Sequence, residues 1–236
     1  MSWDRDSQVT TDTVLHARDP AERERYDSAA DYAYAVLRTA IVDGSFPPAR
    51  RMREVELAAW LGVSRTPTRQ ALSRLELEGL LHVKPRIGLV VSSLDDTAMS
   101  ELYEMRSAME GAAAAMAARH ASARDIATLV ELVETEVTLP TDPEVRSRHN
   151  LAFHQAIYAA AHNRFLIKGL QALNDAIALL GPTTMAVEGR PDEAVREHRA
   201  IVEAIRGGDA KAAEQATREH VLRALELRRS MRRMSP

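Results

Sequence analysis

The chain has 236 residues, a formal net charge of −3 and no cysteine. Its length allows two modest domains, each with its own core. It contains no cysteine, no apolar run near the roughly 20 residues that span a bilayer, and no signal segment. These absences favour a cytoplasmic protein without a membrane partner, and the slightly acidic total excludes a uniformly basic nucleic-acid protein.

The N-terminal stretch 1–26 is polar, charged and without hydrophobic period, which predicts a flexible arm or a late-starting helix. A first helix is predicted from Asp27 to Val42, ending at Gly44. Its inner stripe consists of Tyr34, Leu37, Ala40 and Ile41.

Two short helices and a turn are predicted next. Leu57 and Leu61 share a helical stripe, and Gly62 follows where that helix must stop. Ser64 stands at an N-cap position, and Pro67 lies in the first turn of the next helix. We expect this second helix to continue to Gly79.

The exposed start of that second helix is predicted to be basic and rich in hydroxyl groups. A recognition helix inserts this end into the major groove, where arginine can bind guanine O6 and N7. The side chains expected on the outside are Arg65, Thr66, Thr68, Arg69 and Ser73.

The period then changes to that of strands from Leu81 to Val91, around a turn at 84–88 that carries Lys84 and Arg86. From Arg50 to Val91 the basic residues outnumber the acidic ones. Three helices followed by a small β wing predict a winged helix-turn-helix DNA-binding domain over 27–92.

The remainder, 93–236, is predicted to be an all-α antiparallel bundle of six or seven helices, so the fold class is mainly α. Ser93 is expected to cap its first helix. The breaks fall at proline and glycine clusters. The predicted helices are 93–120, 122–137, 143–161, 164–180, 191–205 and 209–233.

Histidines in this bundle form a candidate metal site. Asn150 and His154 are four residues apart on one predicted helix and therefore share a face. With His198 and His220 from later helices they could bind a divalent ion such as zinc or nickel. The alternative is that these histidines are satisfied by hydrogen bonds or solvent.

The segment from about Ala35 to Val91 resembles the DNA-binding domain of the GntR family of bacterial transcription regulators, through VSRTPTRQAL at Val63–Leu72 and LELEGLL at Leu75–Leu81. The resemblance implies operator contacts by two arginines and further positions. Val55 stands where some relatives carry another DNA-contacting arginine, and Arg53 is its possible substitute. The implied DNA-binding residues are Arg53, Ser64, Arg65, Thr66, Arg69, Arg74 and Gly88.

The second part resembles the FCD effector domain of the FadR subgroup, through NLAFHQAI from Asn150 and EHRAIVEAIRGGDAKAA from Glu197. This implies a divalent metal at Asn150, His154, His198 and His220 that helps to hold a small carboxylate. Asn150 departs from the usual aspartate and brings no charge. Arg106 and Asn174 are the implied effector-binding residues, with a salt bridge to Glu110 as the alternative for Arg106.

The function implied is an effector-responsive transcription regulator, a repressor that binds a palindromic double-stranded DNA operator as a homodimer and senses a small organic acid. Two half-sites are needed because one recognition helix reads few base pairs. The alternative is a metal-dependent, hydrolase-like enzyme with an accessory DNA-binding domain. No convincing general base supports it, since Glu197 and His198 are consecutive and diverge around a helix.

Overall fold

The computed structural model describes residues 20–234, and these form two compact units. One unit ends at Leu94 and also includes Asp175–Gly181, and the other contains Asp95–Asn174 and the chain from Pro182 onward. The expected arm falls mostly outside the described residues. Its last part, Pro20–Arg25, forms a 3-10 helix, η1.

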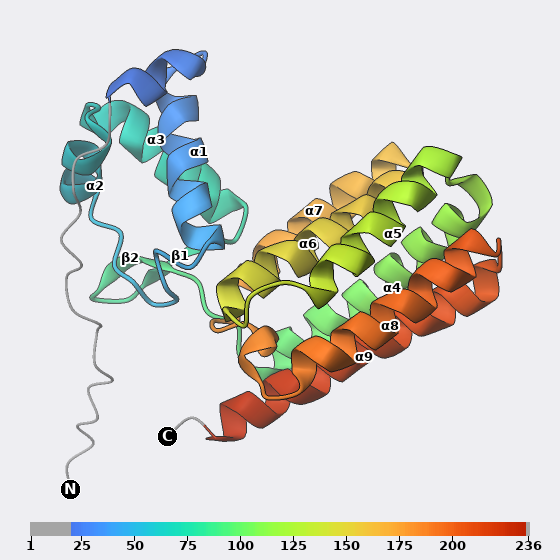
Figure 1. The fold of residues 1–236 in the computed structure, drawn as a ribbon. Helices are drawn as coiled ribbons and strands as arrows, with labels where there is room; N and C mark the ends of the chain where they lie inside the picture. Colours follow the sequence, from blue (N-terminus) through green and yellow to red (C-terminus); the bar gives the residue numbers. More distant parts are fainter. Residues whose placement is uncertain (1–19, 235–236) are drawn as a thin grey trace, which may run out of the picture. The chain divides into compact units, whose positions relative to one another are not determined.

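The first unit contains three α-helices and a hairpin among its described residues (Figure 1). Ser28 caps the first helix by accepting a hydrogen bond from the Asp31 amide. Leu37, Leu57 and Leu75, one from each helix, are fully buried and build a common core. The elements are α1 Ala29–Val42, α2 Glu54–Leu61, α3 Arg65–Leu77, β1 Leu81–Lys84 and β2 Gly88–Val91.

The turn between α2 and α3 depends on Gly62, whose φ of 65° lies in the left-handed region that glycine adopts without strain. Ser64 is the N-cap residue of α3, but its side chain makes no capping hydrogen bond. Thr68, expected outside, is buried, and its hydroxyl donates to the Ser64 carbonyl. Thr68 therefore stabilises the first turn of α3 from its buried side and cannot reach DNA.

The hairpin has the predicted wing form. β1 and β2 are antiparallel, with Leu81 opposite Val91 and Lys84 opposite Gly88. An isolated bridge from Arg51 to Val90 adds the preceding chain to the edge of β2. This extra pairing, which the sequence pattern did not indicate, ties the wing to the segment that leads into α2.

The second unit is helical throughout its regular elements in the described range. Asp95, and not Ser93, caps its first helix, because the Asp95 carboxylate accepts from the Ala98 amide. The expectation for Ser93 was wrong by two residues. A 3-10 turn, η2, was not predicted. The elements are α4 Asp96–His120, α5 Ala123–Val137, α6 Pro143–Ala160, α7 Arg164–Ala178, η2 Thr184–Ala186, α8 Arg190–Arg206 and α9 Ala210–Met234.

The long helix α4 lies at the centre of this bundle and packs against α6, α8 and, most extensively, α9 (Figure 1). Ala113, Ala114 and Ala117 on α4 have no exposed surface. Their small side chains let neighbouring helices approach closely. α5 packs on α6 and α8, so polar side chains from α4, α5, α6, α8 and α9 can meet inside the bundle.

Over the range 20–234, no helix combines the length and the apolar character that a bilayer crossing requires.

Candidate functional site

The exposed start of α3 carries the side chains predicted to contact DNA. Ser64 and Thr66 are exposed, and the side chains of Arg65 and Arg69 are 63% and 64% exposed. Gly88 lies in the exposed turn of the wing with a φ of 98°. A surface depression of about 390 Å³ follows the outer face of α3, lined by Thr66, Arg69, Gln70, Ser73, Arg74 and Leu77.

Both arginines on this end share one carboxylate from α2. Glu54 accepts from Arg65 Nε at 2.8 Å and from Arg69 Nε and Nη2 at 2.8 and 2.9 Å. These hydrogen bonds, that of Arg69 first, lower the pKa of Glu54 to about 2. Glu54 is therefore ionised at neutral pH, and the two guanidinium groups are held beside each other.

Arg53 and Arg74 differ in their availability. Arg53 is exposed at the N-cap position of α2, next to Val55, which is 63% exposed. Arg74 instead stacks on the Tyr34 ring, with its guanidinium carbon 3.6 Å from the ring centroid, and donates to Glu78 at 3.2 Å. It also lies 3.8 Å from Asp31, so contact of Arg74 with phosphate, which remains a prediction, would require that side chain to leave three partners.

Three histidines from three helices of the bundle come together in its interior. His154 on α6, His198 on α8 and His220 on α9 are 2%, 0% and 3% exposed. One potential ligand atom from each lies within 4.8 Å of the others. Asn150 lies one helical turn before His154 on α6, and both His154 and the Asn150 Oδ1 atom are buried.

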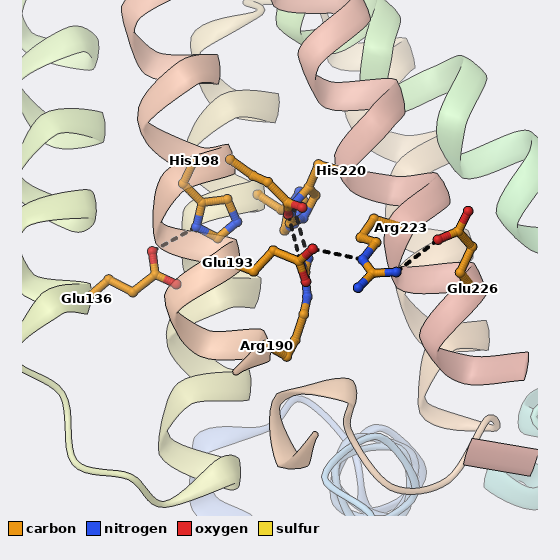
Figure 2. A network of polar contacts seen from close by, with 9 residues as sticks. Glu136, Arg190, Glu193, His198, His220, Arg223 and Glu226 are labelled. Carbon is orange, nitrogen blue, oxygen red and sulfur yellow. Dashed lines mark hydrogen bonds and ion pairs between the residues drawn. The ribbon is translucent and has the colours of Figure 1, made fainter. Parts of the chain in front are cut away.

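Each histidine presents its Nδ1 atom to a glutamate. His198 Nδ1 lies 2.7 Å from Glu136 on α5 and His220 Nδ1 lies 2.6 Å from Glu197, both in hydrogen-bond geometry, whereas His154 Nδ1 lies 2.9 Å from Glu110 on α4 without that geometry. Figure 2 shows Glu136 reaching His198 from a neighbouring helix. A carboxylate at Nδ1 favours the tautomer in which Nε2 carries the free lone pair and can bind a metal.

The Nε2 atoms of two of these histidines lie close to the spacing that such a site requires. The Nε2 atoms of His154 and His220 are 3.1 Å apart. Two nitrogen ligands on tetrahedral zinc, each about 2.0–2.1 Å from the ion, are separated by about 3.3 Å. His198 Nε2 and Asn150 Oδ1 are buried without a hydrogen-bond partner among the described residues. The residues present thus fit a divalent cation: two lone pairs that face each other and two orphaned acceptors.

Burial governs the protonation of this cluster. It lowers the pKa of His198, although Glu136 opposes the shift. Burial, together with the other two histidines, lowers the pKa of His220 well below its ordinary value. Both imidazoles are therefore neutral at neutral pH, the form that can donate a lone pair to a metal.

Arg106 forms the salt bridge to Glu110 that was expected from the sequence as the alternative to effector binding. Its Nε donates to Glu110 at 2.8 Å, and both side chains are buried. Burial opposes ionisation of Glu110, but the Arg106 charge outweighs it and lowers the pKa of that carboxyl to about 2. Glu110 also faces His154, so Arg106 belongs to the histidine cluster through a shared carboxylate.

Asn174 is half-buried on α7 and lies near the Tyr158 hydroxyl, where it opposes a large rise of the Tyr158 pKa caused mainly by burial. Glu110 contributes to the same rise. Asn174 is therefore linked to the cluster indirectly. Arg146 on α6 donates to the Leu139 and Pro140 carbonyls and so holds the loop between α5 and α6.

Sequence reasoning missed four residues of the cluster. Glu110 was considered only as a partner of Arg106, and Glu136 and Arg190 were not singled out. Glu197 was discounted because it diverges from His198, yet it reaches His220 on another helix. Arg190 is 2% exposed, and its guanidinium lies 2.8 Å from Glu197 and 3.3 Å from His220 Nδ1.

Arg190 is linked to further charged side chains on α8 and α9. Glu193 accepts from Arg190 and from Arg223, and Arg223 also donates to Glu226, as Figure 2 shows. One sequence feature could have pointed to this charged group. Glu193 and Glu197 are four residues apart, which places both carboxylates on one face of α8.

Comparison with known proteins agrees with both parts of this description. The model of bacterial regulatory proteins of the GntR family matches residues 29–91, and the FCD domain model matches 101–223. A probable D-xylose utilization operon transcriptional repressor of Paenarthrobacter nicotinovorans is 35% identical over 77% of this chain and 80% of its own length. The uncharacterized HTH-type transcriptional regulator YdhC of Bacillus subtilis is 32% identical over 80% and 84%.

Solved structures share the fold. Escherichia coli McbR/YncC superposes with a TM-score of 0.73 at 21% identity, covering 87% of this chain and 99% of its own. A putative GntR transcriptional regulator from Rhodococcus sp. RHA1 has a TM-score of 0.70 at 20% identity, covering 85% and 97%. These family matches are to transcription regulators and not to enzymes, which removes the metal-dependent hydrolase alternative. The chain belongs to the GntR family of bacterial transcription regulators and carries a C-terminal FCD domain.

Proposed function

We propose that this protein is a homodimeric repressor that binds a two-fold DNA operator and releases it when a small carboxylate binds a metal-containing bundle. The observation that supports the sensor part is the arrangement of three buried histidines, each with Nδ1 beside a glutamate and with one potential ligand atom within 4.8 Å of those of the other two. Because its target is chromosomal DNA, we expect the protein to act in the cytoplasm.

For DNA, we assign base-edge contacts to Arg65 and Arg69, with Ser64, Thr66, Arg53 and Gly88 beside them. The exposure of both arginines at the start of α3 supports this assignment. Arginine binds guanine O6 and N7 in a bidentate manner. Arg74 is assigned a phosphate contact, made after it leaves Tyr34, Glu78 and Asp31. One α3 helix reads only a few base pairs, so two chains are required for the operator to be bound much more tightly than unrelated DNA.

For the sensor, we assign the metal to His154, His198, His220 and Asn150, with zinc or nickel as the ion. Zinc binds imidazole nitrogen readily, and with four protein ligands a position for a further ligand requires five- or six-coordination of the ion. The amide oxygen of Asn150 adds no charge. Asn150 would therefore not offset the charge of the cation that attracts the carboxylate of an effector.

Arg106 and Asn174 are assigned to the effector. The hydrogen bond of Arg106 to Glu110 uses Nε, so its terminal nitrogens can still donate to a carboxylate. The effector can shift DNA affinity only by its own difference in affinity for the DNA-bound and released forms. That coupling is commonly about 1–3 kcal/mol, or about 5- to 150-fold.

The test begins with selection of duplexes from a random DNA library by the untagged protein. We expect a two-fold motif and a complex with two chains per duplex. A panel of small carboxylic acids is then added to the complex, once with zinc-loaded protein and once with protein stripped by chelator. Release only from the zinc-loaded protein is expected. A motif without two-fold symmetry would contradict the homodimer, and equal release from metal-free protein would contradict the role of the metal.

A further inference from the structure

The carboxylate of Glu54 holds two exposed arginines of the neighbouring helix at once. Glu54 is the first residue of α2, where the partial positive charge of the helix N-terminus favours an anion. Its side chain is 22% exposed, whereas those of Arg65 and Arg69 are nearly two-thirds exposed. The carboxylate therefore lies behind the guanidinium groups and orients them without covering them.

The two arginines are held in different ways. Arg65 gives Glu54 only its Nε atom, which leaves both terminal nitrogens free of Glu54. Arg69 gives Nε and Nη2 to the two carboxylate oxygens, a paired contact that fixes the guanidinium plane. Glu54 also reduces the formal charge of the group from +2 to +1. A fixed plane favours recognition of a base edge, and a smaller charge weakens attraction to phosphate of any sequence.

We propose that Glu54 is a positioning residue that sets the sequence selectivity of DNA binding, by holding Arg65 and Arg69 ready for base edges and by offsetting part of their charge. This inference rests on the proposed DNA-binding function. It assigns to Glu54 no contact with DNA of its own.

The same helix provides a matched control. Glu56 lies two residues after Glu54 in the first turn of α2 and faces Arg50 at 3.6 Å, away from the α3 arginines. Glu56→Gln removes the same charge from the same helix end and leaves the Glu54 contacts intact. Glu54→Asp keeps the charge of Glu54 but is one methylene shorter, so it cannot keep all three hydrogen bonds.

The experiment uses the full chain and two fluorescent duplexes of equal length: the motif selected by the wild type and a mixed unselected sequence. Affinity for each is measured by anisotropy over a range of salt concentrations. For Glu54→Gln we expect tighter binding to the unselected duplex, a salt slope steeper by about one, and a ratio of selected to unselected affinity that falls about 5- to 150-fold. For Glu54→Asp the ratio falls while the salt slope stays that of the wild type.

For Glu56→Gln, any change is shared by both duplexes and the ratio is kept. The proposal is overturned if Glu54→Gln and Glu54→Asp keep the wild-type ratio, or if Glu56→Gln lowers it as much as Glu54→Gln. Should Glu54→Gln fail to fold, the ratio for Glu54→Asp alone decides. A wild type that enriches no motif would instead reject the proposed function itself.

Discussion

Glu136→Gln is predicted to weaken metal binding about tenfold without removing any metal ligand. Glu136 is 3% exposed, and its Oε2 atom lies 2.7 Å from His198 Nδ1. A hydrogen bond to a charged group contributes about 1.5–3 kcal/mol, against about 1 kcal/mol for a neutral one. Glutamine keeps an acceptor oxygen but loses the charge, so about 1.4 kcal/mol, or a factor of ten, is expected. Loss of such outer partners typically costs 10- to 100-fold in metal affinity.

The assay is a competition titration of zinc between the untagged protein and a chromophoric chelator at constant pH. Glu134→Gln is the matched control, because Glu134 is exposed on the same helix and its replacement changes the net charge equally. The control should bind zinc like the wild type. If Glu136→Gln also did so, the inference that carboxylates at Nδ1 prepare the histidines for a metal would be refuted.

Arg65→Ala and Arg69→Ala should each weaken binding to the selected duplex by about 1–3 kcal/mol in anisotropy titrations while the circular dichroism spectrum is unchanged. Unchanged affinity of both variants would remove the docking model. His198→Ala or His220→Ala should reduce carboxylate-induced release more than the DNA affinity of the free protein, and a normal response would exclude the metal from sensing. Because burial lowers the pKa of His198 and His220 in the folded state, the unfolded state binds more protons as pH falls. Metal-stripped protein should therefore lose stability below about pH 6.5, the ordinary histidine pKa, and a flat urea midpoint from pH 7.5 to 5 would contradict this.

Most of the correctly predicted fold follows from sequence patterns within short segments. The apolar stripe before Gly62, the cap position at Ser64 and the strand period after Leu80 describe short segments whose structure depends on near neighbours. The errors were also local. Ser93 and Asp95 are both good N-cap residues, and only the path of the chain into α4 decides between them.

The histidines of the candidate site could be predicted from residue type, but the glutamates that contact them could not. His154, His198 and His220 stand out because helical histidines are uncommon in apolar stripes and match a family pattern. Glutamate is common on helices, so neither Glu136 nor Glu197 carries a signal of its own. Their roles depend on which helices pack together, and the packing of α5 against α8 is a tertiary contact that local sequence patterns do not indicate.

The same limit applies to the DNA-binding face. The sequence indicated that Arg65 and Arg69 would be exposed, which the structure confirms. It did not indicate that Glu54, on a different helix, would hold both of them. Thr68 was misplaced because a hydroxyl residue near a helix start is ambiguous: it can face solvent or bond back to the carbonyl four residues earlier, as it does here.

The measurement that tests the sensor part of the proposal most directly is the metal content of the purified protein, prepared without a histidine tag and without chelator. We predict close to one zinc or nickel ion per chain, held by His154, His198, His220 and Asn150. No bound metal, even after dialysis against zinc and then nickel, would contradict it. Asn150 would then mark a lost metal site, and effector binding would have to be explained by Arg106 and the walls of the bundle alone.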